Sequence, residues 1–262
     1  MAIRNKLFSL LVGGATVATL FITGATGAAA SDKATCAGGT IAPGTYSSLT
    51  ITGFCTLDGG DVTVRHNLNV ASTGALDALF SESTLTVGGS LIVEEGGLLA
   101  LGCDPVELAC MDNPDGTSTH SVAHNLKADG AVLMIVHDNR IGGNVDQQGG
   151  GGGFSCNELF PGGPPAYTDY AFNTIGGSAS VTGLRTCWDG FSHNTVGGNV
   201  QLVDNQTAIE DGNLVDGNFI RNNLSCFENV PSPHLSDGPT PMKDIVGGHA
   251  RGQCAAISTS RK

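Results

Sequence analysis

The sequence predicts an all-β fold in which short strands stack rung upon rung as a single-stranded β-solenoid. Three observations predict it: a Gly-Gly pair followed by Asn or Ser recurs along the chain, helical periodicity is nearly absent, and the 39 glycines have no three-residue period. Copies of the repeat at Gly176, Gly197 and Asp216 lie 21 and 19 residues apart. About twenty residues is a plausible length for one rung, whose inward side chains pack only against neighbouring rungs.

Residues 1–30 have the pattern of a secretory signal peptide. A basic start precedes an apolar segment from Leu7 to Ile22, and three alanines end at Ala30, where we expect cleavage. The apolar run is short, rich in Gly and Thr, and lacks a basic stop-transfer flank, which disfavours a membrane anchor. We therefore expect a secreted, extracellular protein whose residues 31–262 form one domain.

The expected mature chain is strongly acidic. Without Arg4 and Lys6 it has 10 Lys+Arg against 24 Asp+Glu, a formal net charge of −14. Nucleic acid and anionic membranes are therefore disfavoured as partners, and acidic polysaccharides would need a bridging divalent cation. Extracellular polysaccharide or cell-surface components are the expected partners, together with end-to-end self-association through the open strand edges of a solenoid.

All eight cysteines follow the expected signal peptide, and an even number in an exported chain predicts four disulfides. Sequential stacking places each cysteine nearest its sequence neighbour, although the sequence alone leaves the other pairings open. No Cys-x-x-Cys occurs, which disfavours a zinc site. The expected pairs are Cys36–Cys55, Cys103–Cys110, Cys156–Cys187 and Cys226–Cys254.

Short segments with alternating apolar and polar residues supply the first strands, at 50–52, 61–64, 68–70 and 90–93. Only the stretches 75–80 and 106–110 could form short helices. The Gly-Gly-Asn/Ser unit is expected at a corner, where glycine permits a tight turn and Asn can bond neighbouring backbone and stack from rung to rung. At about 4.8 Å per rung, about eight rungs would give a rod on the order of 40 Å long.

Three insertions interrupt the repeat, near 103–126, 149–170 and 230–243. The first is rich in acidic residues and histidine, the second opens with five glycines and carries aromatic rings and prolines, and the third is rich in proline. Long loops on a repetitive scaffold are the usual place for function, so candidate sites are sought there.

Several rungs resemble those of a group of secreted, mostly actinobacterial proteins that are largely uncharacterised. The resemblance is carried by Thr-Val-Gly-Gly-Asn-Val at 195–200, by 223–231, by the opening 44–57 and by the late segment 246–254. It covers most of the expected mature chain, while the first two insertions are less familiar. It implies a right-handed parallel β-helix and export, and it implies no activity.

His137, Asp138 and Arg140 form the most conspicuous catalytic candidate. An acid, a base and a cation within four residues could serve a polysaccharide lyase or a glycosidase. Equivalent repeats hold Asp204-Asn205 and Glu228-Asn229, so the Asp-Asn pair here is expected to be a structural corner. The motifs of polygalacturonase-like hydrolases, the Gly-x-Ser-x-Gly elbow and the phosphate-binding loop do not occur.

Two sets of residues in the first insertion could hold a metal. His120 and His124 are four residues apart, but their segment forms helices poorly and lacks the Glu of a His-Glu-x-x-His motif. The oxygen ligands suit calcium but fit no EF-hand or nonapeptide spacing, so a solvated loop is the alternative. No cofactor other than calcium is expected, and its candidate ligands are Asp104, Glu107, Asp112, Asn113 and Asp115.

Aromatic side chains are scarce but gather around the expected Cys156–Cys187 bridge. Tyr167, Tyr170, Trp188 and Phe191 could stack on sugar faces or could pack the loop against the scaffold. The leading hypothesis is a secreted, non-catalytic structural or carbohydrate-binding protein that uses this region. The alternative is an extracellular polysaccharide lyase or glycosidase acting in a groove beside 103–140. A cleft lined by converging carboxylates would favour the enzyme.

Overall fold

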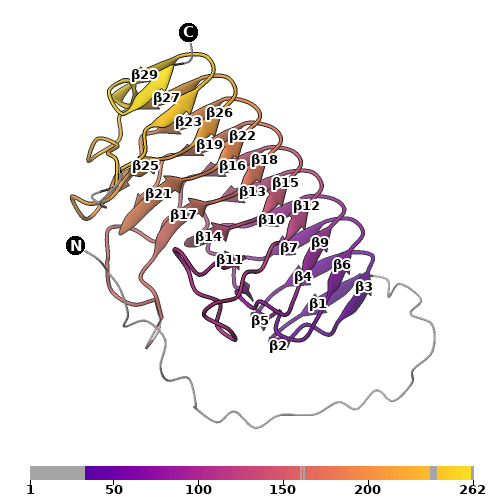
Figure 1. The fold of residues 1–262 in the computed structure, drawn as a ribbon. Helices are drawn as coiled ribbons and strands as arrows, with labels where there is room; N and C mark the ends of the chain where they lie inside the picture. The colour runs from indigo at the N-terminus through magenta and orange to yellow at the C-terminus, as the bar shows by residue number, and fades with distance from the viewer. Residues whose placement is uncertain (1–32, 160, 162, 237–240, 261–262) are drawn as a thin grey trace, which may run out of the picture.

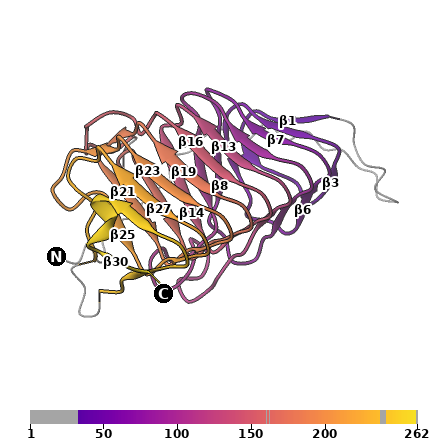
Figure 2. The same cartoon turned by 90° about the horizontal axis from the view of Figure 1, so that it is seen from above.

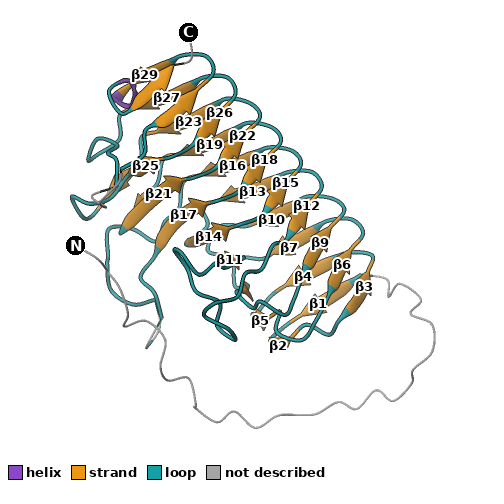
Figure 3. Ribbon diagram, viewed as in Figure 1, coloured by secondary structure: helices purple, strands orange, loops and turns teal. Residues whose placement is uncertain are grey.

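The computed structural model describes residues 33–159, 161, 163–236 and 241–260, so the expected signal peptide lies outside the described residues. Nearly all regular structure is strand, arranged in three long parallel sheets (Figures 1 and 3). The chain passes through the three sheets in turn, and each circuit makes one rung of the stack. The fold is a parallel β-helix, as the repeat predicts.

The strands of each sheet follow one another along the stack, and Figure 2 shows them from above. The first sheet contains β1 (Ala34–Cys36), β4 (Leu49–Ile51), β7 (Leu68–Val70), β10 (Leu91–Val93), β13 (Leu126–Asp129), β16 (Val145–Gln148), β19 (Ala179–Thr182), β23 (Val200–Val203), β27 (Leu224–Phe227) and β29 (Ala250–Gly252). The second sheet contains β2 (Gly39–Thr40), β5 (Phe54–Thr56), β8 (Ala75–Ala78), β11 (Leu98–Leu101), β14 (Leu133–His137), β17 (Tyr167–Ala171), β21 (Trp188–Ser192) and β25 (Leu214–Asp216). The third sheet contains β3 (Gly44–Tyr46), β6 (Val62–Val64), β9 (Leu85–Val87), β12 (Ser121–Val122), β15 (Arg140–Ile141), β18 (Thr174–Ile175), β22 (Thr195–Val196), β26 (Phe219–Ile220), β28 (Asp244–Val246) and β30 (Ser258–Ser260). A small fourth sheet pairs β20 (Arg185–Thr186) with β24 (Gln206–Thr207).

Two sequence-based expectations are corrected. Two of the sheets have ten strands each, so the stack is longer than the eight rungs expected. The stretch 75–80 forms strand β8 rather than a helix, because Leu76 and Ala78 alternate into the core with Asp77 between them. The stretch 106–110 is irregular. The single helix of the described chain is the short 3-10 helix η1 (Gln253–Ala255) near its end.

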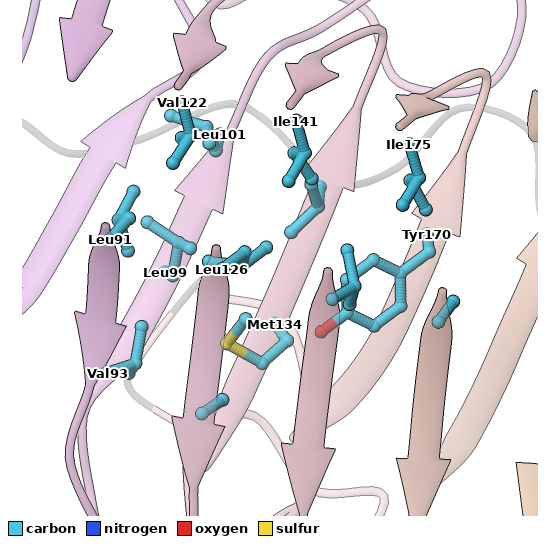
Figure 4. Close-up of a cluster of buried hydrophobic side chains, with 14 of the residues drawn as sticks. Leu91, Val93, Leu99, Leu101, Val122, Leu126, Met134, Ile141, Tyr170 and Ile175 are labelled. Atoms are coloured by element: carbon cyan, nitrogen blue, oxygen red, sulfur yellow. The ribbon is translucent and has the colours of Figure 1, made fainter. Parts of the chain in front are cut away.

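The core is a set of columns inside the coil. Neighbouring strands are parallel and in register, so an inward position in one rung lies directly above the same position in the next; Leu68, Leu91 and Leu126 form one such column. Val122, Ile141 and Ile175 of the third sheet face it across the interior (Figure 4). Each fully buried aliphatic side chain of this kind contributes about 1.5–3 kcal/mol.

The corner between the second and third sheets combines a left-handed residue with a buried polar side chain. Asp138 and His193 have φ of 53° and 55°, and they precede the buried Asn139 and Asn194. Equivalent side chains lie in successive rungs and form a buried ladder. Its members are His120, Asn139, Asn173, Asn194, Asn218 and Asp244.

Each member of the buried ladder satisfies backbone groups of earlier rungs. The Oδ1 of Asn194 accepts the backbone N–H of Asn173 at 3.0 Å, and its Nδ2 donates to the carbonyl of Tyr170 at 2.8 Å. A second buried ladder, Asn205–Asn229–Gln253, does the same between the first and second sheets. The tight turns are therefore stable because their inward N–H and C=O groups have partners.

The Gly-Gly-Asn/Ser unit forms the third corner, as predicted. The backbone N–H of Asn144 donates to Oδ1 of Asn125 at 2.8 Å, 19 residues earlier, and equivalent bonds continue along the exposed edge of the stack. Glycine is required here because a Cβ at Gly143 would collide with the Asn125 side chain and approach the carbonyl of His124. In this exposed ladder the backbone N–H of the later rung donates to a side chain of the earlier rung. In the buried ladders the direction is opposite, because the backbone N–H of the earlier rung donates to a side chain of the later rung.

All four expected disulfides are present. The structure pairs Cys36 with Cys55, Cys103 with Cys110, Cys156 with Cys187, and Cys226 with Cys254. Four disulfides are typical of proteins that fold in an oxidising compartment, and they agree with an extracellular location. In the described part of the chain, no helix combines the length and apolar character needed to cross a membrane.

We predict that Asn194→Ala lowers the free energy of unfolding by about 2–5 kcal/mol, because it leaves the buried N–H of Asn173 and the carbonyl of Tyr170 unpaired. Asn199→Ala, in the exposed ladder, is the matched control, and its loss should stay below about 1 kcal/mol because water replaces the amide. Urea denaturation with the disulfides intact measures both. Equal losses in the two variants would show that ladder burial does not matter.

Candidate functional site

The loops between rungs gather over the outer face of the second sheet. One loop spans 102–120 between β11 and β12, and a second spans 149–166 between β16 and β17; in Figure 1 both protrude beside β14 and β17. The first ends sooner than the expected 103–126, because β12 and β13 continue the rungs. Leu133 and Ile135 point out of the coil and pack with the disulfide of Cys103 and Cys110 in a separate apolar cluster. The first loop is therefore fastened to the sheet by apolar contacts.

A charged cluster lies beside this apolar contact. His137 at the end of β14 points out of the coil, and its Nε2 lies 2.9 Å from Oδ2 of Asp169 on β17. Its Nδ1 lies 3.5 Å from Oδ2 of Asp104 in the first loop, a distance typical of an ion pair rather than a strong hydrogen bond. The exposed fractions of His137, Asp104 and Asp169 are 2%, 6% and 9%. One imidazole is thus enclosed by two carboxylates.

The charge of the cluster follows from this enclosure. Burial alone would lower the pKa of His137, but the charge of Asp169 and the contacts with both carboxylates outweigh it and raise the pKa to about 10. Burial would raise the pKa of Asp104, but His137 and two backbone N–H groups lower it. Those N–H groups belong to Val106 and Glu107 and donate to Oδ1 at 2.7 and 2.9 Å. Asp104 is therefore held in place with its second oxygen directed at His137.

A second imidazole lies on the far side of Glu107. This imidazole is that of His193, and its Nδ1 lies 3.5 Å from Oε1 of Glu107. The His193 ring stacks on Phe172, with ring centroids 4.8 Å apart. Ser192 and Asp216 occupy the positions level with His137 on β21 and β25. Six buried polar atoms here make no hydrogen bond within the described chain: Asp104 Oδ2, His137 Nδ1, Asp169 Oδ1, Ser192 Oγ, His193 Nδ1 and Asp216 Oδ1.

The three catalytic candidates are separated by the fold. Only His137 belongs to the cluster. Asp138 is the left-handed corner residue, and its Oδ2 accepts a hydrogen bond from Thr119 at 2.7 Å outside the cluster. Arg140 begins β15 in the third sheet and is exposed. The proposed acid, base and cation therefore do not converge, because the corner turns the chain between the first and the last of them.

The two histidines proposed for a metal lie in different environments. His120 is 1% exposed and takes the position of an asparagine in the buried ladder. Its Nδ1 accepts the N–H of Leu85 at 2.9 Å, and its Nε2 donates to the carbonyl of Ala78 at 2.9 Å. Burial lowers the pKa of His120 to about 4, so the ring is neutral. His124 is exposed at the next corner.

The oxygen ligands proposed for calcium converge only in part, because Glu107 and Asp104 both lie beside His137 whereas Asp112 does not. Asp104 faces His137, whereas Asp112 accepts hydrogen bonds from the N–H and hydroxyl of Ser81 at 2.8 and 2.9 Å. Asp115 is exposed on the same loop. The structure therefore does not bring the whole set to one point, and calcium binding stays a prediction.

The four rings proposed as a sugar-binding surface are divided by the strand period. Tyr170 and Phe191 are 0% and 1% exposed, so they belong to the core rather than to a surface. Tyr167 and Trp188 point outward, one above the other, with ring centroids 6.2 Å apart in an edge-to-face contact. Trp188 also donates its Nε1 to the carbonyl of Asp211 at 2.7 Å. At most these two rings can contribute to a surface.

Sequence reasoning missed Asp169 and His193, and it named Glu107 only as a possible calcium ligand. Asp169 lies 32 positions after His137, and the second insertion separates them in sequence. The available signal was the strand parity of Tyr-Thr-Asp-Tyr, which places Asp169 on the outer face when Tyr170 points inward. His193 occupies the residue before a ladder asparagine, as Asp138 does, so its position was readable from the repeat.

A scan against models of protein families, a search of curated proteins and a search of solved structures find no match for this chain. The resemblance to actinobacterial proteins therefore stays a prediction.

We predict that His120→Asn keeps the stability at neutral pH and makes it less sensitive to acid. The pKa of His120 is about 4 in the folded chain against 6.5 for an unperturbed histidine, so the unfolded chain binds more protons between these values. His120 should therefore lower the free energy of unfolding by on the order of 3 kcal/mol as the pH falls from 6.5 to 4. Denaturation of both proteins at pH 7 and pH 4.5 tests this, and parallel losses on acidification would contradict it.

We predict that His137→Ala destabilises the fold by about 3–5 kcal/mol, because two buried carboxylates lose their counter-charge. Asp138→Gly and Arg140→Ala are the neighbouring controls. The first relieves a left-handed residue and the second changes an exposed side chain, so each should stay within about 1 kcal/mol of the parent. Chemical denaturation at pH 7 measures all three. A small loss of stability in His137→Ala would contradict the ion pairs assigned to His137.

Proposed function

We propose that this is an exported, non-catalytic β-helix protein that binds neutral polysaccharide at a cell surface. The observation that carries the proposal is that the cluster around His137 is covered. The loop that carries Asp104 packs over β14 and is closed by the disulfide between Cys103 and Cys110. His137, Asp104 and Asp169 are each at most 9% exposed, so a polymer chain has no direct access to them.

The surface that suits such a ligand is the outer face of the third sheet. One outward side chain per rung forms a straight column there, and most of its members carry a hydroxyl group. Hydroxyl groups donate and accept hydrogen bonds without charge, which suits neutral sugars, whereas the acidic chain disfavours acidic ones. This hydroxyl column is formed by Thr45, Thr63, Thr86, Ser121, Thr174 and Thr195. Arg140 interrupts it, and the apolar Phe219 and Ile245 take the same position in the two rungs after Thr195.

Export is supported by the four disulfides together with the expected signal peptide at 1–30. A stack of parallel strands clamped by disulfides presents the same face over many rungs, which suits a repetitive polymer. The outward pair Tyr167 and Trp188 lies on another sheet and would form a separate contact.

A carbohydrate-active enzyme is the second candidate, and one observation favours it. Asp104, Asp169 and Glu107 converge on His137, as the carboxylates of a lyase or glycosidase site would. Turnover would require the 102–120 loop to open. Two depressions of the described surface lie elsewhere, one lined by Cys156 and Pro161 and one by Glu94 and Lys127.

The test uses the mature chain in gels containing neutral or acidic polysaccharides, with reducing ends and unsaturated products followed in parallel. We expect retardation by a neutral polysaccharide without new ends. Thr86→Glu should weaken the retardation roughly tenfold, a loss of about 1.4 kcal/mol, whereas Gln201→Glu on the first sheet should not. Equal retardation of both variants would remove the hydroxyl column from the proposal, and new ends lost in His137→Ala would establish the enzyme instead.

A further inference from the structure

The charged cluster contains the donor set of a metal site that shares only Glu107 with the residues expected to bind calcium. One ligand atom each from Glu107, His137 and Asp169 lie within 4.8 Å of one another, and this is the one such group in the described chain. Two of the three residues are buried. The donors come from the first loop and from two adjacent strands, β14 and β17, so the chain brings together residues that are distant in sequence.

The unpartnered atoms are the second observation. Oδ1 of Asp169, a residue that is 9% exposed, has no hydrogen-bond partner, and the buried Oγ of Ser192 has none either. Buried polar atoms are nearly always paired, so unpaired atoms around one imidazole indicate a missing ligand, water or ion. Four carboxylates, those of Asp104, Glu107, Asp169 and Asp216, face two imidazoles here. In the described part of the chain, the only arginine or lysine ion pair is elsewhere, between Arg185 and Asp204.

We propose that Glu107, His137 and Asp169 bind one divalent transition-metal ion, with Zn²⁺ as its probe. Imidazole and carboxylate together suit zinc and its neighbours, whereas calcium prefers oxygen ligands alone. At metal–ligand distances of about 2.0–2.2 Å, donors on a tetrahedral ion lie about 3.4 Å apart, so the cluster contracts modestly when it binds.

Asp104 completes the arrangement without being a ligand. A metal-bound histidine usually donates its other ring N–H to a carboxylate, which fixes the ring. Oδ2 of Asp104 lies 3.5 Å from one ring nitrogen of His137, while Asp169 lies 2.9 Å from the other. The carboxylate of Asp104 is held by two backbone N–H groups of its own loop, so it can orient the ring. The ion would fasten the 102–120 loop to β14 and β17.

The experiment titrates ZnCl₂ and CaCl₂ into the chelator-treated mature chain by calorimetry and follows the thermal midpoint. We expect one Zn²⁺ per chain, a raised midpoint, and no displacement by a hundredfold excess of calcium. Glu107→Gln should weaken zinc binding at least tenfold, because Glu107 is the accessible ligand. Asp112→Asn, in the same loop but outside the cluster, should bind zinc like the parent.

Two results would overturn the proposal. If zinc neither binds nor raises the midpoint, the cluster is an ion-pair network with a protonated His137. If zinc binds equally well to the parent and to Glu107→Gln, the ion occupies a different site. The proposal does not depend on polysaccharide binding. The hydroxyl column lies on the third sheet and is tested by gel retardation, whereas the charged cluster lies on the second sheet and is tested by zinc titration.

Discussion

The fold depends on solving one problem at its corners. A chain that turns sharply three times per rung directs backbone N–H and C=O groups toward a dry interior, where an unpaired group costs about 1–3 kcal/mol. The buried amide ladders supply the missing partners. Because each amide bonds to the preceding rungs, the ladders also fix the register that aligns the apolar columns. Packing and turn geometry are therefore satisfied by the same side chains.

The same constraint explains which polar residues are structural. His120 replaces an amide in the ladder because an imidazole with a proton on Nε2 offers one acceptor and one donor at its two ends. Asp138 and Glu228 occupy left-handed corner positions, so the turn itself accounts for their recurrence in the repeat. His193 occupies such a position too, but its ring reaches the charged cluster beside Glu107. The scaffold thus allows function only at outward and corner positions.

The solenoid and its disulfides could be predicted because their signals are local. Gly197-Gly198-Asn199 repeats at rung spacing, and each cysteine pairs with its sequence neighbour. The charged cluster could not be assembled in the same way. Its members belong to different rungs, and His137 and Asp169 are separated by an insertion whose length hides their rung spacing in the sequence. The aromatic prediction failed for a simpler reason, since Tyr170 and Phe191 share the inward parity of their strands.

The polarity of the buried ladders has a consequence for how the molecule is built. The N–H of Asn173 is completed by Asn194 in the following rung, and that of Asn194 by Asn218 in the rung after. Each rung is therefore completed by the rung that follows it in the sequence. Asp244 ends the series by accepting the N–H of Asn218, so the last turns of the chain close an end that every earlier rung would leave open.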